Sequence, residues 1–336
     1  MREVASRAGV SVATVFYVLN HGPRPVSPAV RERVLAAVEE LGYVRPARPS
    51  ARRLTVGVAV PDLTTSFFSQ ALLGIDRVLR RAGHLMLAGS SGDTPEGEAT
   101  LLERLLKRGV NGLILTPSGR VPAEIEARAQ RGLKVVVMDR DGGSPSLSSI
   151  TMDNYGSAFS AVRLLLETGH RRIALVNGPE RVSTARERRR GYEDAVTCAG
   201  LKVEPAYIRS GPFRFEHGRE ATLSLLGQEL PPTAIFSSSA ILTAGVLAAL
   251  RERRLAWPDD VAVVGFGDAV WAQLVTPALT VVEQPVVELG RRAAEMLLAQ
   301  DGRKASRQHV VLQSRLVLRD SHWRTVSAGE LLSEAR

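Results

Sequence analysis

The sequence predicts an α/β protein in which a helix-turn-helix headpiece of three helices precedes two parallel, doubly wound sheets. Helical apolar spacing runs through residues 2–42, and two successive runs of alternating strands and helices follow from residue 56 onwards. The length of 336 residues exceeds that of one ordinary domain, and 44% of the residues are hydrophobic. We therefore expect two or three domains, each with a buried core.

Residues 2–20 read as two short helices that cross at a tight turn. Gly9 ends the first helix, because glycine readily adopts the positive φ of a helix end, and the hydroxyl of Ser11 caps the second helix. The apolar residues that recur at helical spacing are Val4, Ala5, Ala8, Val15, Val18 and Leu19. Small and apolar residues at such a crossing are typical of a helix-turn-helix, a motif that places its second helix in the DNA major groove.

A third helix is predicted from Pro28 onwards, with Ser27 as its cap and Gly42 at its end. Its expected buried stripe consists of Val30, Val34, Leu35, Val38 and Leu41. A purely structural three-helix cap would show the same spacing, so the spacing alone leaves that alternative open.

The formal net charge of +9 is concentrated near the N-terminus. Residues 1–55 hold nine Arg and four Glu, a net charge of +5, and the other 281 residues hold the remaining +4. The segment 44–55 contains four Arg together with Pro46 and Pro49, and it reads as a basic linker. Since a basic module can neutralise phosphates, the charge distribution favours double-stranded DNA as a partner.

From residue 56 the pattern changes to apolar strands that alternate with amphipathic helices. The predicted strands are 56–60, 85–88, 112–116, 135–138, 173–177, 206–208, 234–237 and 261–265. The predicted helices are 66–82, 96–108, 122–131, 154–168, 185–199, 216–226 and 241–253. Strands that alternate with helices in this way form parallel sheets covered by helices on both faces.

Such sheets also occur in enzymes, but the residue patterns of catalytic and cofactor sites are missing from the sequence. The turn after Val60 has no Gly-rich phosphate loop, and the GxG at 265–267 lacks a third small residue at the required place. The six His show no metal-binding spacing, and GSSG at 89–92 is not a nucleophile elbow. We predict that the protein is not an enzyme and uses no cofactor or metal.

The only cysteine, Cys198, excludes an intramolecular disulfide and suits a reducing compartment. Its helical surroundings predict a buried structural thiol. The charged N-terminus lacks the apolar segment of a signal peptide, and no apolar run approaches the length of a membrane span. These features predict a cytoplasmic protein without a membrane partner.

The headpiece resembles that of the lactose/galactose repressor (LacI/GalR) family. The likeness rests on AxxAGVSxxTV and VLN in residues 5–20 and on VSPxxRxRVxxAxxxLGY in residues 26–43, and it continues almost to the C-terminus. It implies a nucleoid-associated, ligand-responsive transcriptional regulator, most often a repressor. It also implies a two-lobed, periplasmic-binding-protein-like domain that closes on a small-molecule effector, and a homodimer that binds a pseudo-palindromic operator.

The resemblance also implies domain boundaries. We expect the headpiece at 1–43, a degenerate hinge in the linker at 44–55, the effector-binding and dimerisation domain at 56–325, and a tail at 326–336. Lobe 1 would comprise 56–151 and 285–307, and lobe 2 would comprise 152–284 and 308–325. The tail is too short for a tetramerising helix bundle, so a dimer is expected.

Candidate DNA-binding residues follow from the same resemblance. They are Ser11, Val12, Ala13, Thr14, Phe16, Tyr17, Asn20, Arg52, Arg53 and Leu54. Val12, Ala13 and Tyr17 match base-facing positions, whereas Thr14 and Asn20 match positions that contact the DNA backbone. Phe16 and Tyr17 replace a Ser and an Arg of the family, so the operator should differ from the family's usual one or bind more weakly.

In the linker, Arg52 and Arg53 can hold phosphates, and Leu54 is the only candidate for insertion into the minor groove. Pro49 would interrupt a hinge helix, and the linker looks several residues short. We therefore expect minor-groove insertion to be weak or absent.

Candidate effector-binding residues lie where the family binds its ligands, beyond the carboxyl ends of the strands. They are Phe67, Phe68, Asp139, Arg140, Arg188, Phe213, Ser239, Asp268 and Gln284. Arg188 is the strongest candidate, because its planar fork suits a carboxylate, a phosphate or a vicinal diol. Plain core packing is an equal alternative for Phe67 and Phe68.

The sequence departs from the family at two cleft positions. Ser238, Ser239 and Ala240 replace an Ala-Asn-Asp, and Gly267 replaces the first residue of an acidic pair. The usual hydrogen-bond clamp for a polyol is therefore incomplete, and the effector class stays open among sugars, nucleobases or nucleosides, and other metabolites.

Two other functions would share parts of this sequence. An extracytoplasmic solute-binding protein would have the two lobes but no headpiece, which residues 2–43 contradict. A diverged regulator that has lost effector control or specific operator reading stays a possible alternative.

Overall fold

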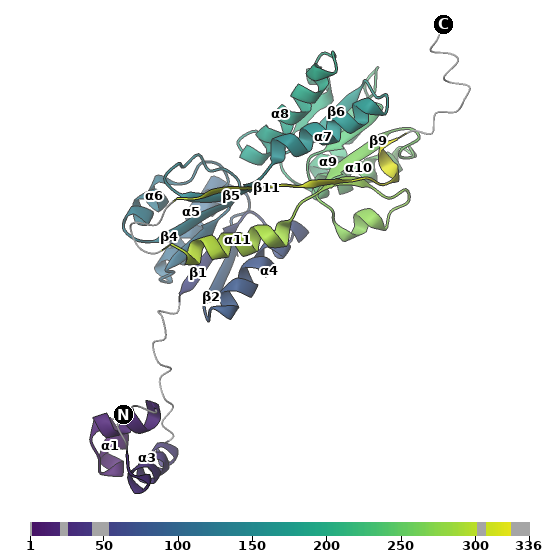
Figure 1. The fold of residues 1–336 in the computed structure, drawn as a ribbon. Helices are drawn as coiled ribbons and strands as arrows, with labels where there is room; N and C mark the ends of the chain where they lie inside the picture. Colours follow the sequence, from purple (N-terminus) through teal and green to yellow (C-terminus); the bar gives the residue numbers. More distant parts are fainter. Residues whose placement is uncertain (1, 21–25, 42–53, 301–306, 324–336) are drawn as a thin grey trace. The chain divides into compact units, whose positions relative to one another are not determined.

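The computed structural model describes residues 2–20, 26–41, 54–300 and 307–323 (Figure 1). The chain divides into two compact units, residues 1–53 and residues 54–336. Each unit has its own buried core.

The first unit is a three-helix bundle of α1 (Arg2–Ala8), α2 (Val12–Asn20) and α3 (Pro28–Glu40). Its core consists of Val4, Ala5, Ala8, Val15, Val18, Val34 and Ala37. Gly9 has a φ of +63° at the end of α1, and the backbone N–H of Thr14 donates to the Ser11 hydroxyl at 3.1 Å. The predicted turn and the predicted cap of α2 are both confirmed.

Two predictions for α3 are wrong, its cap and part of its buried stripe. Ser27 precedes the helix in an extended conformation, but its side chain makes no capping hydrogen bond. The helix runs to Glu40, and the predicted end residue, Gly42, lies outside the described residues. Leu35 and Leu41 are 49% and 44% exposed. The two short neighbouring helices cover only a narrow strip of α3, which is centred on Val34 and Ala37.

The second unit contains two six-stranded sheets. The first sheet has the order β11-β5-β4-β3-β1-β2, and the second has the order β12-β10-β9-β8-β6-β7. The strands of the first sheet are β1 (Thr55–Val60), β2 (Leu85–Ser90), β3 (Gly112–Leu115), β4 (Lys134–Asp139), β5 (Ser148–Met152) and β11 (His309–Leu312). Those of the second are β6 (Ile173–Asn177), β7 (Ile208–Ser210), β8 (Ala234–Ser237), β9 (Ala262–Phe266), β10 (Thr280–Glu283) and β12 (Arg315–Val317). All pairings are parallel except that of β10 with β12.

Helices cover both faces of each sheet, so each lobe has three layers. In lobe 1 one core lies beneath α4 (Ser66–Arg81) and α11 (Val286–Leu298), and another beneath α5 (Pro95–Lys107) and α6 (Ala123–Gln130). In lobe 2 the corresponding pairs are α7 (Asn154–Glu167) with α8 (Ser183–Cys198), and α9 (Phe215–Leu226) with α10 (Ala240–Glu252). Three 3₁₀ turns complete lobe 2: Pro205–Tyr207, Val270–Gln273 and Asp320–His322.

Helices α4 and α11 lie side by side on lobe 1 although 204 residues separate the end of α4 from the start of α11 (Figure 1). Two glycines allow this contact. A Cβ atom on Gly290 would lie 1.9 Å from the carbonyl oxygen of Ala71, and one on Gly74 would lie 2.1 Å from that of Val287. The two backbones therefore touch, and α11 is held firmly on the first sheet after the chain returns from lobe 2.

The chain passes between the lobes three times, and the last crossing corrects the predicted boundary. Strand β11 joins the first sheet, where His309 pairs with Ser149, whereas β12 joins the second sheet. Residues 308–312 thus belong to lobe 1 and not to lobe 2, because β11 extends the sheet at the open edge of β5. The second unit also starts at Leu54, two residues before the predicted start.

The predicted elements agree with the structure where a strand is continuously apolar. Strands β5, β10, β11 and β12 were not predicted from the sequence, and β7 begins at Ile208 and not at Ala206. Cys198 is exposed and not buried, because it is the last residue of α8. None of the described helices is both long and apolar enough to cross a membrane.

Candidate functional site

The candidate effector site lies at the carboxyl ends of the strands, where the two lobes meet. Asp139 ends β4 of lobe 1, Asn177 ends β6 of lobe 2, and Ser238 follows β8. Parallel sheets bind their ligands at this edge, because the loops that follow the strands converge there. The predicted location of the site therefore contains polar residues from both lobes.

Arg188 is fixed within lobe 2 by four contacts. Its Nε and Nη2 atoms donate to Oδ1 of Asn154 at 2.9 and 2.8 Å, and Nη1 donates to the carbonyl oxygen of Ser238 at 2.5 Å. The guanidinium carbon lies 3.8 Å from the centroid of the Phe266 ring. These bonds occupy three of the five N–H groups, so Nη1 and Nη2 each keep one N–H for a ligand.

Burial lowers the pKa of Arg188 to about 10, although the nearby Asp139 opposes that shift. The group therefore stays charged at neutral pH. Burial also raises the pKa of Asp139, and the positive charges of Arg140 and Arg188 act against this rise. A carboxyl group of lobe 1 and a guanidinium of lobe 2 thus interact electrostatically across the junction between the lobes.

Arg140 points into lobe 1 and not towards lobe 2. Its Nη1 atom donates to Oδ1 of Asp93 at 2.6 Å and to the carbonyl oxygen of Pro117 at 3.1 Å. Asp139 adopts a φ of +68° directly before it, a conformation that Asp tolerates better than most residues. Arg140 therefore holds together the loops that follow β2 and β3.

Two direct contacts join the lobes at this edge. Arg181 of lobe 2 donates from Nη2 to the carbonyl oxygen of Asp93 at 2.5 Å, and the same nitrogen lies 3.7 Å from Oδ2 of Asp93. The backbone N–H of Asp141 in lobe 1 donates to the hydroxyl of Ser183 in lobe 2 at 2.9 Å. We call these two contacts the lobe latch; no pattern in the sequence predicted them.

Several buried polar atoms at the strand ends have no hydrogen-bond partner within the described part of the chain. They are Ser91 Oγ, Thr116 Oγ1, Arg140 Nε, Asn177 Oδ1, Ser237 Oγ and Ser238 Oγ. Buried polar groups are nearly always hydrogen-bonded. These groups at the carboxyl ends of both sheets can bind water or a polar molecule.

Phe67, Phe68 and Phe213 contribute mainly to packing. Phe68 is buried in the core beneath α4, and Phe67 packs against that core with the two ring centroids 5.0 Å apart. Of the two roles considered for this pair, core packing is therefore the role of Phe68. Phe213 is partly buried against the core of lobe 2, close to Gly178.

The three other predicted cleft residues have partners within the chain. The Ser239 hydroxyl accepts from the backbone N–H of Leu242 at 3.3 Å and caps α10. Both carboxylate oxygens of Asp268 accept from Arg319, at 3.0 and 2.6 Å. The side-chain amide of Gln284 donates to the Met152 sulfur at 3.1 Å. Met152 lies at the first lobe crossing, and Gln284 lies at the second.

Glu98 is a buried carboxyl group that was not predicted from the sequence. It accepts a 2.5 Å hydrogen bond from the backbone N–H of Ser118, and burial raises its pKa. Acidic residues in the first turn of a helix are normally exposed, where they favourably oppose the helix dipole. Nothing in the sequence of α5 distinguishes Glu98 from such a residue.

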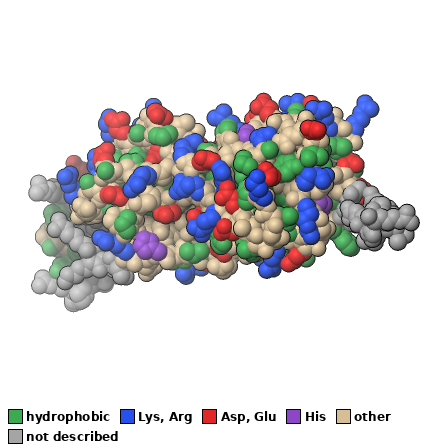
Figure 2. All heavy atoms as spheres, turned by 90° about the horizontal axis from the view of Figure 1, so that it is seen from above, with side chains coloured by type: hydrophobic (Ala, Val, Ile, Leu, Met, Phe, Trp, Pro, Cys, Tyr) green, Lys and Arg blue, Asp and Glu red, His purple; other side chains and the backbone are tan. Residues whose placement is uncertain are grey.

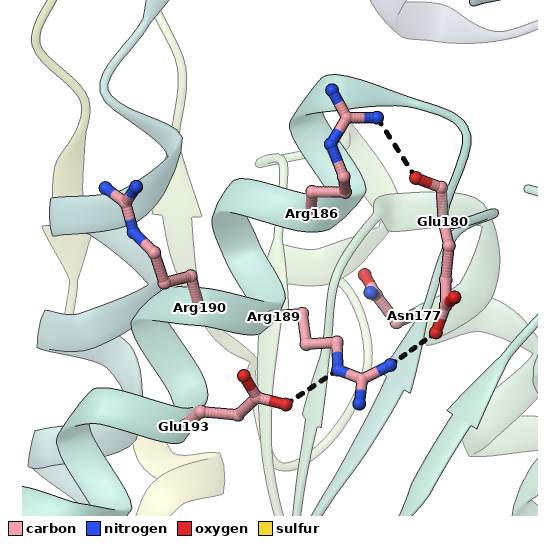
Figure 3. A pocket seen from close by; sticks show the side chains of 6 residues that line it. All are labelled: Asn177, Glu180, Arg186, Arg189, Arg190 and Glu193. Atoms are coloured by element: carbon pink, nitrogen blue, oxygen red, sulfur yellow. Dashed lines mark hydrogen bonds and ion pairs between the residues drawn. The ribbon is translucent and has the colours of Figure 1, made fainter.

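A pocket of about 230 Å³ lies between α8 and the loop that precedes it, and it shares Asn177 with the strand-end site (Figure 3). Its lining residues are Asn177, Glu180, Arg186, Arg189, Arg190 and Glu193. Arg189 is ion-paired with both Glu180 and Glu193. Because these charges are compensated within the wall, we do not assign the effector to this pocket.

The exposed face of α2 carries two of the three predicted base-facing residues, Val12 and Ala13, together with Phe16. Val12 and Phe16 are 42% and 47% exposed, Ala13 is exposed, and Tyr17 is half-buried, with its ring centroid 6.0 Å from that of Phe16. The hydroxyl of Thr14 lies 2.9 Å from that of Ser11. The side chain of Asn20 and the residues Arg52 and Arg53 lie outside the described part of the chain.

Leu54, the candidate for minor-groove insertion, packs within the second unit. Its side chain packs partly against the first core of lobe 1, and its carbonyl oxygen accepts from the backbone N–H of Leu85 at 3.0 Å. The expectation that minor-groove insertion is weak or absent stays a prediction.

Acidic and basic side chains are interspersed on the face of the molecule that Figure 2 shows. The described surface there does not gather charge of one sign, so it offers no phosphate-binding stripe on that face. The excess of Arg in residues 1–55 makes the N-terminal part of the chain the favoured place for DNA contacts.

Known proteins match both units of this chain. Residues 1–46 match the bacterial regulatory proteins of the lacI family, and residues 162–322 match the periplasmic binding protein-like domain. The HTH-type transcriptional repressor CytR of Escherichia coli (strain K12) is 35% identical over 324 residues, which cover 94% of this chain and 93% of CytR.

Solved structures are also similar over 95% of this chain and 98% of theirs. The transcriptional regulator CelR in complex with cellobiose has a TM-score of 0.74 at 31% identity. The lac repressor dimer bound to operator and the anti-inducer ONPF has a TM-score of 0.78 at 27% identity. The chain therefore belongs to the lacI family of bacterial regulatory proteins.

Proposed function

We propose that this protein is a transcriptional repressor that binds a pseudo-palindromic operator as a homodimer, with an affinity set by a small polar effector. Membership of the lacI family and the helix-turn-helix of residues 2–20 support the DNA-binding part. The lac repressor, a structural relative, is a dimer on its operator. The protein acts in the cytoplasm, on the nucleoid.

The observation that carries the effector part is that lobe 1 and lobe 2 each bring a buried charged group to this edge: Asp139 at the end of β4, and Arg188 of α8, which donates to the carbonyl oxygen of Ser238 after β8. A molecule that contacts both groups gains binding energy only while the lobes keep one relative arrangement. Ligand binding therefore shifts the population of lobe arrangements. Since lobe 1 is continuous with the linker, this shift changes the affinity for DNA.

The charges around the site favour an uncharged effector. Three carboxyl groups and three guanidinium groups gather there: Asp93, Glu98, Asp139, Arg140, Arg181 and Arg188. The unpartnered hydroxyl and amide groups need partners that both donate and accept hydrogen bonds. An uncharged hydroxylated molecule, such as a sugar or a nucleoside, meets both requirements.

The proposal is tested on the full-length chain with duplex DNA from the region upstream of its own gene. A library of sugars, nucleosides and nucleobases is first screened for a rise in melting temperature. Gel shifts then compare DNA binding with and without each compound that raises it. We expect a shift that responds to at least one compound; the absence of any shift at low salt contradicts the proposal.

Arg188→Ala should abolish the response to the compound but leave DNA binding in place. Arg190→Ala is the matched control, because Arg190 lies on the same helix and its partners, Glu187 and the Tyr155 ring, belong to lobe 2. An Arg188→Ala variant that keeps the full thermal response would show that the ligand binds elsewhere.

A diverged regulator without effector control is the second candidate. The internal partners of Ser239 and Asp268 favour it, because those side chains are already engaged within the chain. In that case the protein would bind DNA, but no compound in the library would change its melting temperature or its DNA affinity.

A further inference from the structure

The exposed face of α2 is apolar. Val15 and Val18 are buried in the core of the first unit, and the opposite face presents Val12, Ala13 and Phe16 to solvent. We call these three exposed residues the reading patch. Large apolar side chains gathered on one exposed face of a short helix usually mark a binding surface. In a helix-turn-helix this face of the second helix enters the major groove.

The reading patch lacks the side chains that usually distinguish bases. Bidentate hydrogen bonds to guanine come from Arg or Lys, and those to adenine come from Asn or Gln. Residues 12–18 contain none of these four residue types. The Thr14 hydroxyl lies within hydrogen-bond distance of the Ser11 hydroxyl, so it already has a partner at the helix start.

The only apolar group that the four bases present in the major groove is the 5-methyl group of thymine. We propose that the reading patch selects operator half-sites through contacts with thymine methyl groups, with Phe16 and Val12 as the main contact residues. This inference rests on the proposed function, since it requires α2 to lie in the major groove. Each fully buried methyl group should strengthen binding about fourfold.

The first experiment identifies a duplex that the full-length protein selects. Inverted-repeat duplexes with randomised half-sites are enriched over several rounds of binding, and the best duplex is synthesised again with deoxyuridine at each thymidine in turn. Deoxyuridine pairs like thymidine but lacks the 5-methyl group. The dissociation constant of each duplex is measured by fluorescence anisotropy at one fixed salt concentration, because phosphate contacts depend strongly on salt.

We expect thymine to be enriched at one or two positions in each half-site, and deoxyuridine there to weaken binding about fourfold per methyl group. Phe16→Ala should remove the preference for thymidine at one of these positions. Phe16→Leu should keep it, because a branched apolar side chain still contacts the methyl group. Leu35→Ala is the control, since Leu35 is equally exposed on α3 but lies outside the reading patch.

The possible outcomes separate the inference from the proposed function. A selected duplex that binds equally well with deoxyuridine at every position overturns the inference and leaves the proposed repressor intact. A thymidine preference that survives in both Phe16→Ala and Val12→Ala also overturns it, because another residue then reads the methyl group. A failure to enrich any sequence contradicts specific operator binding, and with it both proposals. Circular dichroism of each variant shows whether the headpiece is still folded.

Discussion

The Nε and Nη2 atoms of Arg188 share a single acceptor, the Oδ1 atom of Asn154, at 2.9 and 2.8 Å. Asn154 is the first residue of α7 and follows directly after the first lobe crossing. The chain segment that enters lobe 2 therefore orients the guanidinium that we propose as the main effector contact. The cleft and the lobe crossing are coupled through these two side chains.

Replacing Asn154 with Ala should destabilise the protein by about 1.5–3 kcal/mol, because two N–H groups of the buried, charged Arg188 side chain lose their acceptor. Urea denaturation of the wild-type and variant proteins measures this difference in the free energy of unfolding. Asn154→Asp is the matched control, since a carboxylate oxygen can still accept both bonds. Equal stability of the wild-type and Ala proteins would contradict the structural role of this pair.

The lobe latch should hold the lobes together in the absence of effector. Arg181→Gln removes the ion pair with Asp93, and because Arg181 is partly exposed the effect should be modest, up to about a fivefold rise in the ratio of open to closed molecules. Spin labels on the exposed Cys198 of lobe 2 and on Glu103→Cys of lobe 1 report the distance between the lobes.

Dilution of the labelled chains with unlabelled protein isolates the distances within one chain. Arg190→Gln removes the same charge from the same lobe, but its partners lie within lobe 2, so its distance distribution should match that of the wild type. If Arg181→Gln also gives the wild-type distance distribution, the lobe latch does not hold the lobes together, and the prediction is wrong.

Asp139 should make stability depend on pH. Burial raises the pKa of its carboxyl group above the ordinary value of 3.8, so the folded state favours the protonated form. Its contribution to stability is fully present below the ordinary pKa and is lost as the pH rises through the raised value. The wild type should therefore lose stability relative to Asp139→Asn as the pH rises from the ordinary pKa through the raised pKa.

Thermal melting of both proteins from about pH 4 to pH 7 measures this difference. Asn is a suitable replacement, because it also tolerates the positive φ at this position. A melting-temperature difference that stays constant with pH would show that the Asp139 carboxyl group has an ordinary pKa.

The contact between α4 and α11 should tolerate no side chain at Gly290. Gly290→Ala forces a Cβ atom against the carbonyl oxygen of Ala71, so the helices must separate, at a cost of about 1–3 kcal/mol. Gly119→Ala is the control, because a Cβ atom there meets nothing within 4 Å. Chemical denaturation should show a large loss in the free energy of unfolding for Gly290→Ala and none for Gly119→Ala.

The sequence predicted the strands whose residues are buried on both faces, such as 56–60 and 173–177, because these are continuous apolar runs. It missed β5 and β11, which lie next to each other at the edge of the first sheet and alternate buried or half-buried residues with more exposed ones. Short edge strands with polar residues resemble loops in the sequence. The boundary of lobe 2 was misplaced for the same reason.

The polar contacts of the site were predictable only in part. Arg188 and Asp139 were found through the family resemblance, whereas the link between Asp93 and Arg181 joins residues 88 positions apart in the chain. A charged residue in an exposed turn has no sequence signal that identifies its partner. The engagement of Asp268 by Arg319 was hidden in the same way, because it depends on the return of the chain through β12.

The central claim is that a ligand between the lobes and DNA at the headpiece influence each other, and reciprocal titration tests it most directly. The DNA dissociation constant of the full-length dimer is measured with and without a saturating compound from the thermal screen, and the dissociation constant of the compound is measured with and without DNA. We expect both to change by one common factor, about 5- to 150-fold, in the wild type, and neither to change in Arg188→Ala. Unchanged DNA affinity at a saturating concentration of a compound that binds the wild-type protein would contradict the account.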